Sequence, residues 1–173
     1  MKGPKHLKEI FHPVNDDNTE GEIICSCGCR NFKIEYFGER LNSEDNDCPI
    51  IYADEYNGKF ALVVKAICEN CGERRLLFDF AKHGYDGLIC GYGISVDDSM
   101  LKAFTNDQED IFQIKMMIEV DSEEQFLEEI VNDPPENMTF TPDDRYDIWS
   151  WVVIELKSTK SGDIINLVDE ELA

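Results

Sequence analysis

The sequence predicts an α+β fold that is mainly antiparallel β structure, with one helix over residues 122–132 packed against the strands. Several short runs alternate apolar and polar residues, as strands with one buried face do. One segment combines a capping signal with an apolar stripe at helical spacing. Two short cysteine motifs each end a strand-like run and are followed by glycine. With 173 residues, the chain can bury a core without disulfides.

The N-terminal part combines a lead-in with two predicted strands. Residues 1–20 are polar and contain Pro13, so we expect an irregular segment in which a few apolar residues make one docked turn. Strands are predicted at 22–24 and at 32–37, where apolar and charged residues alternate. The first cysteine motif lies between these strands, which we therefore expect to form a hairpin.

A second predicted hairpin follows a polar insertion. The stretch 38–58 is acidic and is predicted to lie on the surface, with a short strand at 50–52. Residues 60–67 form a nearly continuous β-prone run, as in a central strand, and end at the second cysteine motif. Residues 74–81 are then expected to return beside that strand.

The C-terminal half contains the predicted helix. Four glycines between positions 84 and 93 predict tight turns or a bulged strand. Residues 111–120 alternate as a half-buried strand does. Ser122 and Gln125 form a capping box, and the helix is expected to end before two prolines. Its apolar stripe consists of Phe126, Leu127, Ile130 and Val131.

The last predicted elements are a strand over 148–157 and a partner over 164–168, joined by a turn. Residues 164–168 can be the second arm of a hairpin or a helix capped by Asp163, and we favour the hairpin. Trp149 and Trp151 are two positions apart, so they are expected on the same face of the strand.

The composition is strongly acidic, with 16 Lys and Arg against 37 Asp and Glu, a net charge of −21. Residues 1–104 contribute −6 and residues 105–173 contribute −15. Such a surface disfavours nucleic acid, because binding must neutralise phosphates. The sequence shows neither a membrane-spanning run nor a signal peptide, and we expect a cytoplasmic protein with no membrane association.

The cysteines predict a metal site formed by Cys25, Cys27, Cys68 and Cys71. The alternative is that they are free, partly buried thiols that act as small hydrophobic residues. Four thiolates make a closed tetrahedral site of the kind that zinc prefers. The chain has seven cysteines, and the CxC and CxxC spacings fit metal ligation better than a disulfide framework. Cys29 lies close enough in sequence to substitute for Cys25 or Cys27. Four basic residues near the motifs are expected to offset the negative charge: Arg30, Lys33, Arg74 and Arg75.

These cysteines, together with Gly28 and Gly72, resemble the knuckles of four-cysteine zinc-ribbon proteins over about residues 22–80. One departure is that the first knuckle is a residue shorter than the usual CxxCG. The resemblance implies a structural Zn²⁺ and two ribbon hairpins that continue into a sheet. We expect a lead-in over 1–20, a ribbon-like part over 21–82 that includes the insertion, and an acidic α+β part over 83–173, in the same domain or closely packed on it.

We expect a non-catalytic, zinc-stabilised binding protein whose acidic surface binds a protein partner. A basic protein is one candidate for that partner. Two alternatives stay open. In the nucleic-acid alternative the zinc ribbon is the binding element. Trp149 and Trp151 would suit stacking on bases, but the acidic charge around them favours burial in the core or in an interface. An enzyme would use His83, Asp86 and Cys90 as acid, base or nucleophile.

Overall fold

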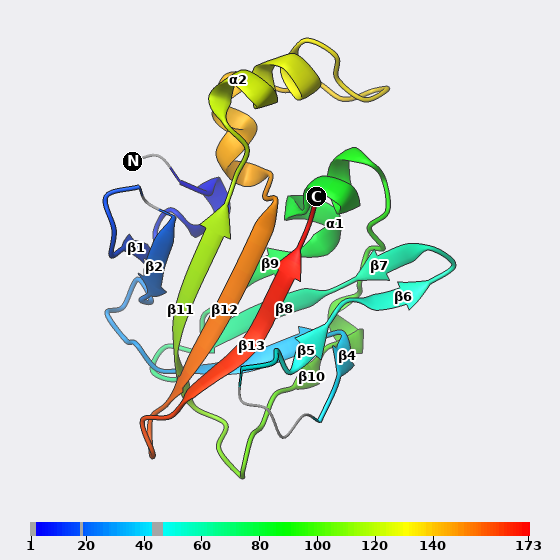
Figure 1. Ribbon diagram of the computed structural model, residues 1–173. Helices are drawn as coiled ribbons and strands as arrows, with labels where there is room; N and C mark the ends of the chain where they lie inside the picture. The colour runs from blue at the N-terminus through cyan, green and yellow to red at the C-terminus, as the bar shows by residue number, and fades with distance from the viewer. Residues whose placement is uncertain (1–2, 18, 43–46) are drawn as a thin grey trace.

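The computed structural model describes residues 3–17, 19–42 and 47–173 and has the predicted mainly antiparallel α+β fold (Figure 1). Within those residues one sheet of nine strands curls around a hydrophobic core. Its strands are β1 (Phe11–Pro13), β2 (Glu20–Ile23), β3 (Phe32–Phe37), β8 (Val63–Cys68), β9 (Arg74–Asp79), β10 (Lys102–Ala103), β11 (Phe112–Glu119), β12 (Trp151–Ser158) and β13 (Ile164–Glu171).

Strand β11 organises the sheet. Its side chains alternate strictly between buried and exposed positions, as the sequence predicts. One edge pairs along its whole length with β12, and β12 in turn pairs with β13. The C-terminal hairpin favoured for 164–168 is therefore confirmed, although β13 extends to Glu171. The inward side chains of β11, which include Phe112 and Met116, are fully buried in the core.

The first predicted hairpin is wrong. Strands β2 and β3 do not pair with each other; both are antiparallel to β11 and lie on the edge that β12 leaves free. Glu22 is opposite Lys115, and Phe32 is opposite Phe112. The first cysteine turn is thus an excursion between two strands that run the same way. The alternation of apolar and polar residues in 22–24 and 32–37 predicts strands, but it does not predict which strands they pair with.

The second predicted hairpin is confirmed, with β8 and β9 paired antiparallel across the second cysteine turn. The run 60–67 divides at Leu62, whose carbonyl accepts a hydrogen bond from Phe80 N–H, so β7 (Lys59–Ala61) precedes β8. Strand β9 ends at Asp79 because that side chain accepts a hydrogen bond from Ala81 N–H and caps helix α1 (Phe80–His83).

The polar insertion contains two small ribbons. Strand β4 (Glu39–Arg40) pairs with β5 (Ile51–Tyr52), and β6 (Asp54–Tyr56) pairs with β7. Strand β5 confirms the short strand expected at 50–52. Ile50 N–H donates to Asn166 O, which attaches this insertion to β13. Residues 43–46 of the predicted acidic run lie outside the described residues.

The glycine-rich segment was expected to form tight turns or a bulged strand, and it forms helical turns. Helix α1 is followed by the π-helical turn η2 (Tyr85–Ile89), where Cys90 N–H donates to Tyr85 O. Gly87 is required here, because a Cβ atom would lie 1.8 Å from Phe80 O. This close approach lets η2 pack directly on α1. The short turn η3 (Asp98–Met100) follows further along the chain.

The predicted helix over 122–132 is present as α2 (Glu123–Phe126) continuing into η4 (Leu127–Val131). Ser122 Oγ accepts from Gln125 N–H, as the capping signal predicts. The helix stands beyond the end of the sheet (Figure 1). Phe126 and Ile130 form a second apolar cluster with Ile148, flanked by η2. The helix therefore packs mainly on other helical turns, and the expectation that it packs against the strands is wrong. The turn η5 (Pro142–Asp147) completes this region, called the helical end below.

The lead-in is more ordered than the sequence predicts. It contains the turn η1 (Lys5–Leu7) and strand β1, which pairs with β2. Leu7, Ile10 and Phe11 are almost completely buried in the main core. The docked turn expected from these residues is therefore part of the fold. No helix in the described ranges is long and apolar enough to cross a membrane.

Candidate metal centre

The first cysteine turn is closed by its own backbone. Cys25 N–H donates to Cys29 O at 2.9 Å, and Gly28 N–H donates to Cys25 O at 2.8 Å. Gly28 has a φ of 89°, a region that a side chain would strain. The short CxC spacing therefore still gives a compact turn, with Cys25 buried and Cys27 exposed.

The second cysteine turn has a similar construction. Cys68 N–H donates to Glu73 O and Gly72 N–H donates to Cys68 O, both at 2.9 Å. Gly72 also has a positive φ, 74°. Glu69 N–H donates to Asn31 O, and this hydrogen bond connects the second cysteine turn to the segment that follows the first cysteine turn. Again the first cysteine is buried and the second, Cys71, is exposed.

The two turns bring four sulfur atoms together: the Sγ atoms of Cys25, Cys27, Cys68 and Cys71 all lie within 4.8 Å of one another. The Cys25–Cys71 separation is 3.5 Å and the Cys27–Cys68 separation is 3.6 Å. Sulfurs at about 2.3 Å from a tetrahedral zinc ion would lie about 3.8 Å apart. The four cysteines fit a metal ion of this size with only small adjustments.

Backbone amides favour the thiolate at all four sulfurs, and at two of them the net effect is a lowered pKa. Burial opposes ionisation of Cys68, but the N–H groups of Cys71 and Asn70 outweigh it and lower the pKa of the thiol to about 6. The N–H of Cys29 and the side chain of Asn70 lower the pKa of Cys27. Burial raises the pKa of Cys25. A metal ion would supply the charge needed to ionise that buried sulfur.

The basic residues expected to offset the thiolate charge pair with carboxylates. Arg30 is 2.7 Å from Glu22, and Lys33 is 3.9 Å from Asp110. The remaining contacts are between Arg74 and Glu35, and between Arg75 and both Glu9 and Glu73. The groups placed to stabilise the sulfurs directly are therefore the amides of the two turns.

Cys29, predicted as a possible substitute ligand, lies outside the sulfur cluster. Its Sγ is 3.5 Å from Asn31 N and 3.6 Å from Asn31 O. It also packs on the main core, and its carbonyl closes the first turn. Cys29 therefore does not replace Cys25 or Cys27 in the cluster, and the first knuckle keeps its short CxC spacing.

Of the three candidate catalytic residues, the structure brings Asp86 and Cys90 into contact, whereas the buried ring of His83 bonds to Asp79. Asp79 N–H donates to His83 Nδ1 at 3.0 Å, and burial lowers the pKa of His83 to about 2. Cys90 is exposed, and its Sγ is 3.8 Å from an Asp86 carboxylate oxygen. Burial and Asp86 raise the pKa of Cys90, which leaves little thiolate near pH 7. The His83 ring contacts Asp79, Phe78 and Trp149, and not Asp86 or Cys90.

His83 instead stacks on a residue that sequence reasoning left without a role. The His6 and His83 rings have centroids 4.0 Å apart and planes 4° apart, and both contact Trp149. His6 Nε2 donates to Leu77 O at 3.1 Å. Nothing in the sequence indicated this stack, because it joins the lead-in to three distant segments.

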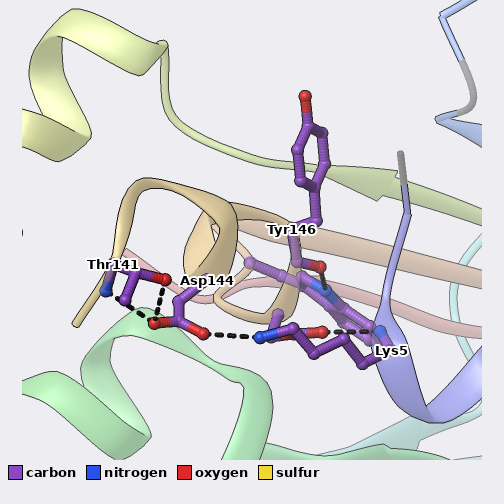
Figure 2. Close-up of polar contacts among 6 residues, drawn as sticks. Lys5, Thr141, Asp144 and Tyr146 are labelled. Atoms are coloured by element: carbon purple, nitrogen blue, oxygen red, sulfur yellow. Dashed lines mark hydrogen bonds and ion pairs between the residues drawn. The ribbon is translucent and has the colours of Figure 1, made fainter. Parts of the chain in front are cut away.

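Charged residues fasten the lead-in beside that stack (Figure 2). Lys5 Nζ is 2.6 Å from Asp144 and 3.2 Å from Asp147, and Lys5 N–H donates to Asp147 at 2.7 Å. Thr141 N–H and Oγ donate to the same Asp144 carboxylate. A groove of about 310 Å³ lies here, lined in part by Lys5, His6, Lys82 and His83.

The two tryptophans do not form one platform. Trp149 precedes β12, is fully buried, and donates from Nε1 to Tyr146 O. Trp151 begins β12, is 37% exposed, and donates from Nε1 to Asp169 at 2.7 Å. The expected shared face fails because the chain becomes a strand only at Trp151.

Comparison of the chain with protein-family models, with curated protein sequences and with solved structures gave no match. The fold and the site define a curled antiparallel sheet with four clustered cysteines that could bind a metal ion.

Proposed function

We propose that Cys25, Cys27, Cys68 and Cys71 hold one structural Zn²⁺ and that the protein is a zinc-stabilised binding protein. The observation that carries this proposal is the approach of all four Sγ atoms to within 4.8 Å of one another. Four thiolates fill a tetrahedral zinc ion and leave no position for water or substrate. The ion would therefore fasten the two turns, and chemistry at the ion is not part of the proposal.

The proposed activity is non-catalytic recognition of a protein partner by the acidic surface. The net charge of −21 supports a basic partner, because association is steered by complementary charge. The pairing of Arg30, Arg74 and Arg75 with carboxylates weighs against nucleic acid, since those guanidinium groups are already neutralised. The proposed location is the cytoplasm, where thiols stay reduced and available for metal.

Metal analysis of protein purified without chelator tests the zinc proposal. We expect about one equivalent of zinc per chain, and we expect a strong chelator to remove it with a large loss of thermal stability. Less than about half an equivalent, in protein that still unfolds cooperatively at the same temperature after chelation, would show that the thiols fold without metal.

A further inference from the structure

The outer face of β11, β12 and β13 carries exposed apolar side chains in adjacent positions. Met117 is opposite Val153 in the β11–β12 ladder, and Trp151 is two pairs further along, on the same face, opposite Glu119. Met117 is 46% exposed and Trp151 is 37% exposed, while Val153 is half-buried. We call Met117, Val153 and Trp151 the outer strip. No other described element lies over this face in Figure 1.

Carboxylates surround the outer strip on several sides. The ladder places Glu20 beside Met117, Glu119 beside Trp151, Asp169 beside Val153, and Glu171 beside Trp151. One lysine, Lys115, is in the adjacent row, and it pairs with Glu20. The strip is thus an apolar centre within an acidic rim, and its nearest cation is already neutralised.

The hollow beside the outer strip and the fixed position of its indole ring suit a binding surface. A hollow of about 50 Å³ lies between β11 and β12 and is lined by Met117 and Val153 among others. The hydrogen bond from Trp151 Nε1 to Asp169 fixes the indole, so little side-chain entropy is lost on contact. Trp and Met are enriched at the centres of protein interfaces, where water is excluded by a surrounding rim.

We infer that the outer strip is the docking site for a basic, amphipathic segment of a partner protein, whose apolar residues cover Met117, Val153 and Trp151. This inference rests on the proposed binding function and locates it on one face. Lys or Arg on both sides of the partner's apolar residues would meet Glu119 and Glu171 at one end and Glu20 and Asp169 at the other. An acidic partner would be repelled by the same rim.

The test uses full-length, zinc-loaded protein and two 18-residue helical peptides with the same leucine face, one with lysine and one with glutamate on the polar face. Titration calorimetry measures the affinity, and tryptophan fluorescence reports on Trp151, since Trp149 is fully buried. We expect the lysine peptide to bind and shift the emission, and the glutamate peptide to bind at least tenfold more weakly.

Matched variants locate the contact. Met117→Lys should weaken the lysine peptide at least tenfold, whereas Met100→Lys, at a methionine 48% exposed on η3, should not. Glu119→Lys should weaken it more than Glu128→Lys on η4, which makes the same change in net charge. The zinc content of every sample is measured first.

Three outcomes would overturn the inference. They are equal affinities for the two peptides, equal effects of the two methionine variants, and a single-stranded oligonucleotide that shifts the emission and displaces the lysine peptide. If the peptide binds zinc-loaded protein but ignores Met117→Lys, the outer strip is wrong while an acidic binding protein remains. If the protein contains no zinc, the proposed function itself fails at its metal site.

Discussion

The cysteine turns and the helical end are held together in different ways. At the turns, four sulfurs within 4.8 Å of one another depend on two short hydrogen-bonded loops, and two of these sulfurs are exposed. At the helical end, the Phe126 cluster and the neighbouring His6–His83–Trp149 stack depend on many contacts between distant segments. Loss of one cysteine ligand would therefore disrupt the whole cluster of cysteine turns. At the helical end, each substitution would lower stability by an amount that depends on the contacts it removes.

Removing a ligand should have the largest effect. Cys68→Ser is expected to lose zinc and to lower the free energy of unfolding by more than about 5 kcal/mol, because a structural metal site contributes its binding energy to folding. Metal analysis and urea unfolding measure both. The control is Cys90→Ser, at an exposed thiol outside the cluster, which should keep the metal and its stability. Equal effects of the two variants would contradict a ligand role for Cys68.

Removing the centre of the stack should have the next largest effect. Trp149→Ala deletes a fully buried indole that contacts Phe78 and both stacked histidines, and it should cost about 3–5 kcal/mol in unfolding free energy. Trp151→Ala, at a tryptophan 37% exposed, should cost about 1 kcal/mol or less. Urea denaturation compares them, and a similar cost for both would show that the stack adds no stability.

The histidine stack should make stability depend on pH. Burial lowers the pKa of His83 to about 2 and also lowers that of His6, whereas an unfolded chain protonates histidine near pH 6.5. Below about pH 6.5 the unfolded state binds more protons, so this stabilisation is complete above that pH and falls as the pH is lowered. The expected slope is up to about 1.4 kcal/mol per pH unit for each histidine.

The variant His83→Phe keeps an aromatic ring and removes one proton site. Unfolding free energies at several pH values between 7.5 and 5 should therefore fall less steeply for the variant than for the parent, whatever its stability at pH 7.5. Parallel curves for the two proteins would exclude His83 as a source of the pH dependence.

The surface ion pair at the lead-in should matter least. Lys5 is 2.6 Å from Asp144, but its side chain is 63% exposed and the interaction is screened by salt. Lys5→Met should change the unfolding free energy by about 0.2–1 kcal/mol at low salt and by less in high salt. A larger, salt-independent loss would mean that the methylene chain of Lys5 contributes packing beside the stack.

Features that depend on neighbouring residues were predictable from the sequence. The strict alternation of β11, the Ser122 cap and the two cysteine turns follow from spacings within a few residues, and the turns bring together the four predicted cysteines. Local spacing does not indicate which strands pair with each other. The predicted pairing of β2 with β3 is wrong for this reason, because both strands pair with β11.

The parts that sequence reasoning missed depend on contacts between distant segments. His6 has a clear place only once the lead-in crosses to Leu77, His83 and Trp149. The glycines at 84–93 predicted turns. The reason that Gly87 must be glycine is its close contact with Phe80 O, and no local sequence pattern indicates this contact. Trp149 and Trp151 were separated by the point at which β12 begins, and that boundary is set by tertiary packing.

The position of β11 also has a consequence for the order of folding. All four clustered cysteines have been synthesised by residue 71, but the strand that aligns β2 with β3 begins only at Phe112. Contacts of such high sequence separation form slowly, because a long loop must close first. A metal ion captured by the growing chain would join the two turns while β11 is still being made. The ion would then shorten the loops that remain to be closed.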